Sequence, residues 1–190
     1  MTAALASPEE AARRRTLLRL PHMGPLAAFA AALRRTSPHV LPDMDPLDGG
    51  TGARVLLLLE KPGPQAARTG FVSRDNPSPT SAAIRAFLEE VGLPRADTLL
   101  WNAAPFWNGT IRLRAPERQD GFRHLPALLA LLPRLDTAIL VGRHAARAEP
   151  LLPRHLRVIR SAHPSPQVRA AFPDRWAAIP RAWAEARRPP

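Results

Sequence analysis

Residues 55–64 read VLLLLEKPGP, and this stretch decides the fold. Its first five residues are apolar, a length that suits a buried strand and is too short for an independent helix. A Pro/Gly-rich run, residues 62–64, then stops the pattern abruptly. In an open α/β sheet, ligands bind in the crevice formed by the loops that leave the carboxyl ends of the strands. We therefore expect Glu60 and Lys61 to lie at a ligand site.

Other segments of the chain alternate between strand and helix patterns. Three more apolar segments have the length of strands: Thr98–Trp101, Thr137–Val141 and Leu156–Ser161. Helices are expected over Pro25–Arg35, from an N-cap at Thr80 or Ser81 to Val91, over Pro116–Leu132, from His144 onward, and from Pro173 or Asp174 to Arg187. Strands that alternate with helices favour parallel pairing with right-handed crossovers. The sequence predicts an α/β fold, a three-layer α/β/α sandwich with a central four-stranded parallel sheet.

The length of 190 residues suits one domain with a sizeable core. We expect an N-terminal extension over residues 1–24 and a single α/β domain over residues 25–190. Residues 42–52, PDMDPLDGGTG, are interpreted as a linker, because the acids lack EF-hand spacing and the glycines precede a strand instead of following one. Residues 65–79 are expected to form a long polar loop.

The amino-acid composition excludes several kinds of site and indicates a class of partner. The chain has no cysteine, which excludes disulfides, a thiolate nucleophile and cysteine-ligated metal, and is typical of a cytoplasmic protein. No signal peptide or membrane span is expected, and neither is a metal or cofactor. The net charge of +11 fits a polyanionic partner. Because Lys61 is the only lysine in an arginine-rich chain, part of that charge reflects compositional bias.

Four polar or small residues, Glu60, Asn102, Gly142 and His163, each follow a predicted strand. Parallel strands place their carboxyl ends at one edge of the sheet, so we expect these residues to converge there. Taken singly, each has a structural explanation: Asn102 could cap a turn, and the HPSP stretch that begins at His163 could form a rigid turn.

Together and in order, the motifs resemble those of the uracil-DNA glycosylase superfamily over about residues 53–166. The matching stretches are Leu59-Glu60-Lys61-Pro62-Gly63, Phe71 before Val72, Leu99-Leu100-Trp101-Asn102 and His163-Pro164-Ser165-Pro166. The resemblance implies the α/β/α fold that the pattern of elements also predicts. Without cysteine, the chain would belong to the members that hold no iron-sulfur cluster.

The resemblance also implies roles for individual residues. The catalytic residues would be Glu60, His163 and Lys61: Glu60 would position water, with Asp75 and Asn76 as alternatives, and His163 would stabilise the negative charge on the departing base. The base would be bound by Phe71, Asn102 and Gly63, with the ring stacked on Phe71 and its edge read by Asn102. The residues expected at DNA phosphates, or at the gap that a flipped base leaves, are Ser165, Pro164, Gln167, Gly142 and Ser81.

Three positions depart from the family pattern. Lys61 stands where the most efficient members have Asp or Asn; it could contact the leaving base or a phosphate, form a Schiff base, or simply pair with Glu60 at the surface. Gly63 replaces a bulky residue that excludes the thymine methyl group, which predicts a wider pocket. Gln167 replaces an apolar wedge after HPSP, so the gap could be filled differently or the substrate could be single-stranded.

The sequence therefore predicts a DNA repair enzyme, a uracil-DNA glycosylase that acts by base flipping in base excision repair. Its partner would be uracil-containing DNA, single- or double-stranded, and a monomer is expected. The main alternative is a weakly active or inactive member that binds DNA or a base. A nucleotide-binding α/β enzyme is disfavoured because no P-loop or dinucleotide glycine fingerprint follows a strand.

Overall fold

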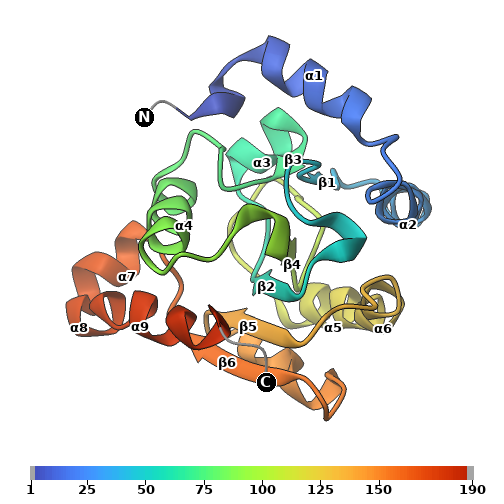
Figure 1. The fold of residues 1–190 in the computed structure, drawn as a ribbon. Helices are drawn as coiled ribbons and strands as arrows, with labels where there is room; N and C mark the ends of the chain where they lie inside the picture. The colour runs from blue at the N-terminus through green and yellow to red at the C-terminus, as the bar shows by residue number, and fades with distance from the viewer. Residues whose placement is uncertain (1–2, 188–190) are drawn as a thin grey trace.

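Four parallel strands form the central sheet of the computed structural model, which describes residues 3–187 (Figure 1). They are β2 (Val55–Leu59), β4 (Thr98–Asn102), β5 (Thr137–Val141) and β6 (Arg157–Ser161). Their order is β4-β2-β5-β6. Every residue of β2, β4 and β5 is buried, as expected for strands covered by helices on both faces. The predicted four-stranded parallel sheet is confirmed.

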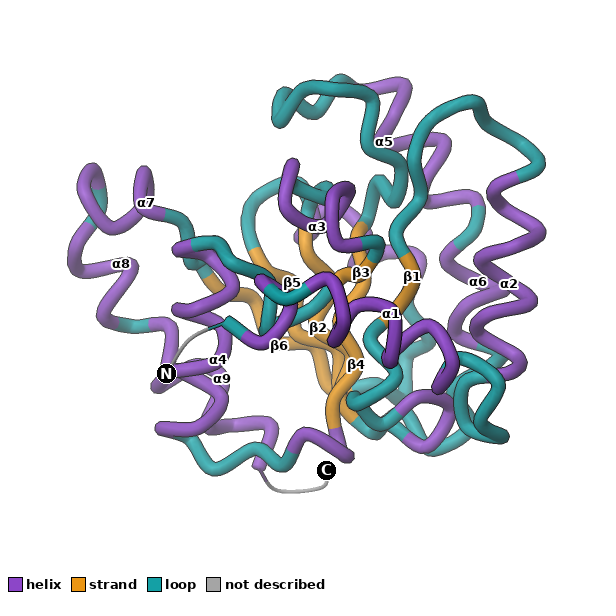
Figure 2. Tube along the Cα trace, turned by 90° about the horizontal axis from the view of Figure 1, so that it is seen from above, coloured by secondary structure: helices purple, strands orange, loops and turns teal. Residues whose placement is uncertain are grey.

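Helices cover both faces of the sheet, which confirms the three-layer sandwich. Figure 2 shows α4 (Pro79–Glu90), α7 (Pro166–Ala171), α8 (Pro173–Ala177) and α9 (Ile179–Ala184) on one side, and α2 (Gly24–Arg34), α5 (Ala115–Arg123) and α6 (Leu125–Leu129) on the other. The described residues also form 3-10 turns: η1 (Ala4–Ala6), η2 (Gly50–Gly52), η3 (Arg95–Asp97), η4 (Ala145–Leu151) and η5 (Glu185–Arg187).

Several helix boundaries differ from the sequence prediction. The helix expected over residues 116–132 is two helices, α5 and α6, which break at His124. Pro126 explains the break, because proline inside a helix lacks a donor and clashes with the carbonyl four residues earlier. The closing helix is likewise divided, with prolines in the first turns of α8 and α9. Helix α4 begins after Ser78, whose Oγ accepts a hydrogen bond from the Ser81 N–H at 3.1 Å.

The segments interpreted as a linker and a polar loop both contain regular structure. Strand β1 (Asp43–Met44) pairs in parallel with β3 (Phe71–Val72), forming a two-stranded ribbon beside the main sheet. Helix α3 (Pro64–Thr69) precedes β3 and ends at Gly70, whose φ of +84° favours glycine. These short elements escaped prediction because two-residue strands carry no periodic signal.

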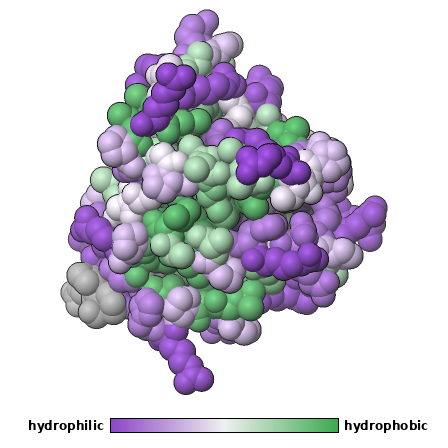
Figure 3. Space-filling model, turned by 90° about the vertical axis from the view of Figure 1, so that its right-hand side faces the viewer, coloured by the Kyte–Doolittle hydropathy of each residue, from purple (hydrophilic) through white to green (hydrophobic). Residues whose placement is uncertain are grey.

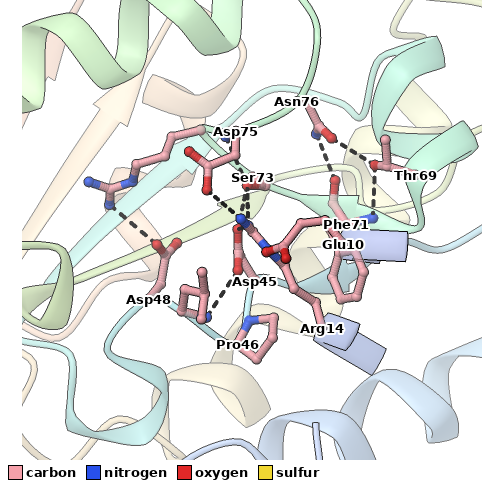
Figure 4. Close-up of polar contacts among 12 residues, drawn as sticks. Glu10, Arg14, Asp45, Pro46, Asp48, Thr69, Phe71, Ser73, Asp75 and Asn76 are labelled. Atoms are coloured by element: carbon pink, nitrogen blue, oxygen red, sulfur yellow. Dashed lines mark hydrogen bonds and ion pairs between the residues drawn. The ribbon is translucent and has the colours of Figure 1, made fainter. Parts of the chain in front are cut away.

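A buried ion-pair network fixes helix α1 (Pro8–Leu17) to this ribbon (Figure 4). The Arg14 side chain is 1% exposed and donates to Glu10 at 2.7 Å, to Asp75 at 2.8 Å and to Asp45. Arg95 joins from η3, at 2.7 Å from both Asp45 and Asp75. Acids that lie in the predicted linker and loop therefore hold the N-terminal helix in place. The predicted domain boundary at residue 24 stays a prediction, and residues 1–2 and 188–190 lie outside the described part of the chain.

The surface that carries α2 and α6 is apolar in its middle and hydrophilic around it (Figure 3). Leu151 is an exposed apolar residue of a shallow pocket formed with α6, and Leu129 and Leu156 line the same pocket. Between residues 3 and 187, no helix has both the length and the hydropathy needed to cross a bilayer.

Candidate functional site

A cavity of about 1390 Å³ opens at the carboxyl ends of the parallel strands. Glu60 follows β2, Asn102 ends β4, Gly142 follows β5 and His163 comes shortly after β6, and all four residues line the cavity. The register explains the convergence, because Leu59 lies opposite Asn102 and Val141 lies opposite Ser161. The residues that the sequence predicted at one sheet edge are thus neighbours in space.

Asn102 presents an unusual polar atom to the cavity. Its side chain is 3% exposed, and its Nδ2 has no hydrogen-bond partner within the described residues. The backbone around it is fixed, because the N–H groups of Ala103 and Ala104 donate to the carbonyls of Leu59 and Glu60 at 2.7 and 2.9 Å. The buried Nδ2 of Asn102 therefore has its donor capacity unused within the described residues.

The Glu60 carboxylate is held by the loop that follows β5. Its Oε1 accepts a hydrogen bond from the backbone N–H of His144 at 2.9 Å. Gly142 makes room for this contact: its φ is +95°, and a Cβ atom there would lie 2.5 Å from the same oxygen. The structure thus gives Gly142, a predicted phosphate contact, a contact with Glu60 instead. The N–H of Gly142 donates to the Ser161 carbonyl at 2.9 Å.

His163 begins a rigid turn. The Ser165 N–H donates to the His163 carbonyl at 2.8 Å, and the Ser165 Oγ caps α7 by accepting from the Val168 N–H at 3.3 Å. Burial lowers the pKa of His163, and the carboxylate of Glu60 acts in the opposite direction. The imidazole is therefore neutral at physiological pH, and a neutral ring still has one N–H to donate.

The Lys61 side chain points toward the loop of residues 108–114 and the start of helix α5, where its hydrogen-bond partners lie. Its Nζ donates to Asn108 Oδ1 at 2.7 Å, to the Arg112 carbonyl at 3.2 Å and to Glu117 Oε1 at 2.6 Å. The Lys61 side chain is 3% exposed and that of Glu117 is 24% exposed, so the surface pair with Glu60 that we considered is replaced by a partly buried pair with Glu117. An ammonium group has three N–H donors, and all three have acceptors here.

Phe71 lies outside the cavity lining. Its ring is fully buried and packs with Leu5 and Ala11 of the N-terminal segment. The next residue, Val72, does line the cavity. Because successive residues of a strand point to opposite faces, one residue of β3 faces the N-terminal segment and the next faces the cavity.

The two alternative water-positioning residues also have structural partners. Asp75 belongs to the ion-pair network with Arg14 and Arg95 and does not line the cavity. Asn76 lines the cavity, but its Nδ2 donates to the Phe71 carbonyl at 2.8 Å and its Oδ1 accepts from Thr69 at 2.7 Å. Both residues brace the ribbon, which leaves Glu60 as the candidate.

The remaining predicted residues surround the opening. Gly63, Ser81, Ser165 and Gln167 line the cavity, whereas Pro164 is buried behind it. A Cβ atom on Gly63 would meet nothing within 4 Å, which agrees with an open pocket at this position. Ser81 is buried and accepts a hydrogen bond from the Ser78 hydroxyl at 2.9 Å, so its main partner is within the protein.

Two walls of the cavity were missed by the sequence analysis. One is the loop of residues 108–114, which contributes Ile111 and Leu113, and the other is α7 and α8 with Phe172 and Arg175. The isoleucine in a polar loop was visible in the sequence, whereas the exposure of Phe172 was not. Neither had a periodic pattern or a family motif to connect it with the site.

The fold and the site define an α/β protein with a large cavity at the carboxyl ends of a parallel sheet. The sequence model of the uracil DNA glycosylase superfamily matches residues 46–187, and the chain belongs to this superfamily. Among solved structures, it is similar to a variant of mimivirus UNG crystallised in complex with UGI, at 15% identity and a TM-score of 0.41. The match covers 80% of this chain and 68% of that chain. A search of curated proteins finds no match.

Proposed function

We propose that the chain is a DNA glycosylase that hydrolyses the N-glycosidic bond of uracil, or of another deaminated or mismatched base, after flipping the base out of DNA. The observation that carries this proposal is the unpartnered Nδ2 of Asn102, buried at the cavity. Buried donors are rarely left unpaired, and each costs about 1 to 3 kcal/mol. A ligand carbonyl at this point would remove that cost.

Uracil has the edge that Asn102 can read. The amide Nδ2 would donate to uracil O4, and Oδ1 would accept from N3–H, whereas cytosine reverses both positions. Val72 supplies apolar surface in the same cavity, and Gly63 leaves space beside it. We therefore assign base recognition to Asn102 and propose loose discrimination at C5 of the ring.

The chemistry follows from Glu60 and His163. Glu60 Oε1 is held by the His144 N–H, so we assign the other oxygen, Oε2, to the attacking water. The water oxygen bonds to C1′ of the deoxyribose as the C1′–N1 bond breaks, and the electron pair of that bond moves onto the base. Glu60 takes the proton of the water, and the N–H of neutral His163 donates to O2, where negative charge develops.

DNA is the proposed partner, bound by a monomer in the cytoplasm. The net charge of +11 supports a polyanionic ligand, and the motif resemblance supports a nucleobase. Lys61 is not assigned to the chemistry, because each of its donors is already bound by an acceptor of the protein.

Excision of uracil from single- and double-stranded oligonucleotides, at one stated salt concentration, tests the proposal. We expect the wild type to release uracil and the variants Glu60→Gln and His163→Ala to lose most of that activity. His155→Ala is the matched control, because His155 is exposed and lines the separate pocket beside α6. Binding without release of any deaminated base by the wild type would instead identify a non-catalytic, base-binding member of the superfamily.

A further inference from the structure

Ile111 is the most exposed large apolar residue of the described chain, at 70%, and it lies at the mouth of the cavity that holds Asn102 and His163. Single exposed apolar residues are common and need no function. Its position is different because it stands near the tip of the loop of residues 108–114, NGTIRLR, which forms one wall of the site.

The base of the loop is held by a buried charge. The ammonium group of Lys61 binds Asn108 and the Arg112 carbonyl on the two sides of the tip, and it binds Glu117 at 2.6 Å. Glu117 also accepts from Asn108 Nδ2 at 2.7 Å and from the Arg114 N–H at 2.8 Å. Although burial acts in the opposite direction, these hydrogen bonds from Lys61 and Arg114 lower the pKa of Glu117. The loop is therefore clamped at its ends while Ile111 projects.

The charges beside the tip suit a nucleic acid. Arg112 and Arg114 follow Ile111 in the same loop, and both are exposed. Across the mouth, Phe172 is 52% exposed, and the guanidinium of Arg175 lies 5.7 Å from the centre of its ring. Proteins that open a base step insert an apolar side chain into it while nearby arginines bind the adjacent phosphates. Ile111 with Arg112 and Arg114 provides this combination.

We propose that Ile111 is the wedge that enters the duplex beside the flipped base and that Lys61 is the positioning residue that holds its loop. This inference rests on the proposed function. It assigns the gap-filling role to the loop after β4, so Gln167 after the HPSP turn need not perform it. It also gives the only lysine a role that needs no reactive amine.

Single-turnover excision by Ile111→Ala tests the wedge. Unstacking a base step costs a few kcal/mol, so we expect excision from a uracil·adenine duplex to fall by about tenfold or more. Excision from the same sequence as a single strand should stay within about twofold, because no duplex has to be opened. Leu151→Ala, which removes an exposed apolar side chain from the separate pocket beside α6, is the matched control and should resemble the wild type on both substrates.

A readout that does not require cleavage separates the wedge from the proposed function. A 2-aminopurine placed next to the uracil becomes brighter when it is unstacked, so the wild type should raise its fluorescence on binding the duplex and Ile111→Ala should not. If the wild type releases no uracil but raises the fluorescence in an Ile111-dependent way, the wedge stands and the proposed function fails. If Ile111→Ala behaves as the wild type does in fluorescence and in duplex excision, the wedge is wrong.

The positioning role of Lys61 is tested by coupling. Lys61→Met should lower the ratio of duplex to single-strand excision, as Ile111→Ala does, and the double variant should be no worse on duplex than Ile111→Ala alone. Glu117→Gln, which weakens the same clamp, provides a second variant if Lys61→Met does not fold. Additive losses in the double variant, or a covalent adduct between Lys61 and DNA after borohydride treatment, would show that Lys61 acts independently of the loop.

Discussion

The carboxylate of Glu60 occupies the space that a side chain on Gly142 would need, because a Cβ atom there would lie 2.5 Å from Oε1. Two loops that leave neighbouring strands, β2 and β5, are fitted together by this contact and by the hydrogen bond from the His144 N–H. The candidate catalytic carboxylate is thus oriented by backbone alone on that side. The position of the Glu60 carboxylate therefore depends on Gly142, which has no side chain to take part in the reaction.

Gly142→Ala should therefore displace Glu60. The added methyl group collides with Oε1, and the φ of +95° adds strain of about 1 to 2 kcal/mol for a residue with a side chain. We expect uracil excision to fall nearly as far as in Glu60→Gln, with the double variant no worse than Glu60→Gln alone. Gly24→Ala is the control, because a Cβ atom there meets nothing within 4 Å. Full activity in Gly142→Ala would show that the placement of Glu60 is unimportant.

Asn102→Leu should separate activity from stability. One well-made bidentate contact to a base edge contributes about 1 to 3 kcal/mol, so excision should fall by roughly 10- to 100-fold. The thermal midpoint should not fall, because the substitution removes a buried donor that has no partner in the described protein. Thermal unfolding and single-turnover kinetics on one preparation provide both values. A large loss of stability would mean that the Asn102 amide holds the strand end together.

Gly63 should determine what the cavity accepts at C5 of the base. Because the space beside it is open, we expect the wild type to act on uracil and, more slowly, on thymine in a guanine·thymine mismatch. Gly63→Tyr should reduce thymine release more than uracil release, since the φ of −91° accepts any residue and the ring would fill the space of the methyl group. The ratio of the two rates is the measurement. An unchanged ratio would place C5 elsewhere in the cavity.

Arg14 tests whether the N-terminal helix belongs to the folded unit. Arg14→Ala leaves the carboxylates of Asp45 and Asp75 without one of their cationic partners, and breaking such a buried pair costs about 3 to 5 kcal/mol. Arg13→Ala is the matched control: the Arg13 side chain is 53% exposed and pairs with Glu10, and an exposed pair contributes little, so the loss should be much smaller than in Arg14→Ala. Urea unfolding of the two variants measures the loss in free energy of unfolding for each. Equal losses would contradict the anchoring role of the network.

Asp48 makes stability depend on pH. Burial raises its pKa from 3.8 to about 7; Arg74 and Arg95 oppose the rise, and Asp45 and Asp75 add to it. The native state then holds a proton that the unfolded state releases, so this contribution to stability is present at low pH and is lost as the pH rises through about 7. Asp48→Asn cannot release that proton. The variant should gain stability relative to the wild type between about pH 5 and pH 8 in denaturant titrations, and a difference that is constant with pH would refute this.

The sheet was predictable because its strands are apolar runs bounded by turn residues. Thr137–Val141 has the predicted bounds, and β4 differs from prediction by the addition of Asn102. The convergence of Glu60, Asn102, Gly142 and His163 followed from topology alone. Long-range contacts of single side chains did not follow, because no local pattern encodes them.

At the site, the contacts of Lys61 and Phe71 could not be predicted from the sequence for the same reason. The sequence placed Lys61 just after a strand and Phe71 in a polar loop, and assigned both to the site, but it could not show where either side chain points. Lys61 turns toward Glu117, which lies 56 residues away in the chain, and Phe71 turns toward Leu5. Whether a residue beside a predicted cavity faces it depends on partners that only the folded chain brings near.

The parallel arrangement of the sheet also determines when the site comes into existence. Glu60, Asn102, Gly142 and His163 come from four successive strand ends, and each parallel pair forms only after a long crossover has closed. Contacts of such high sequence separation form slowly. No fragment that lacks one of these strands contains the site, so the return of base release after dilution from denaturant would report completion of the whole sheet, later than signals from its helices.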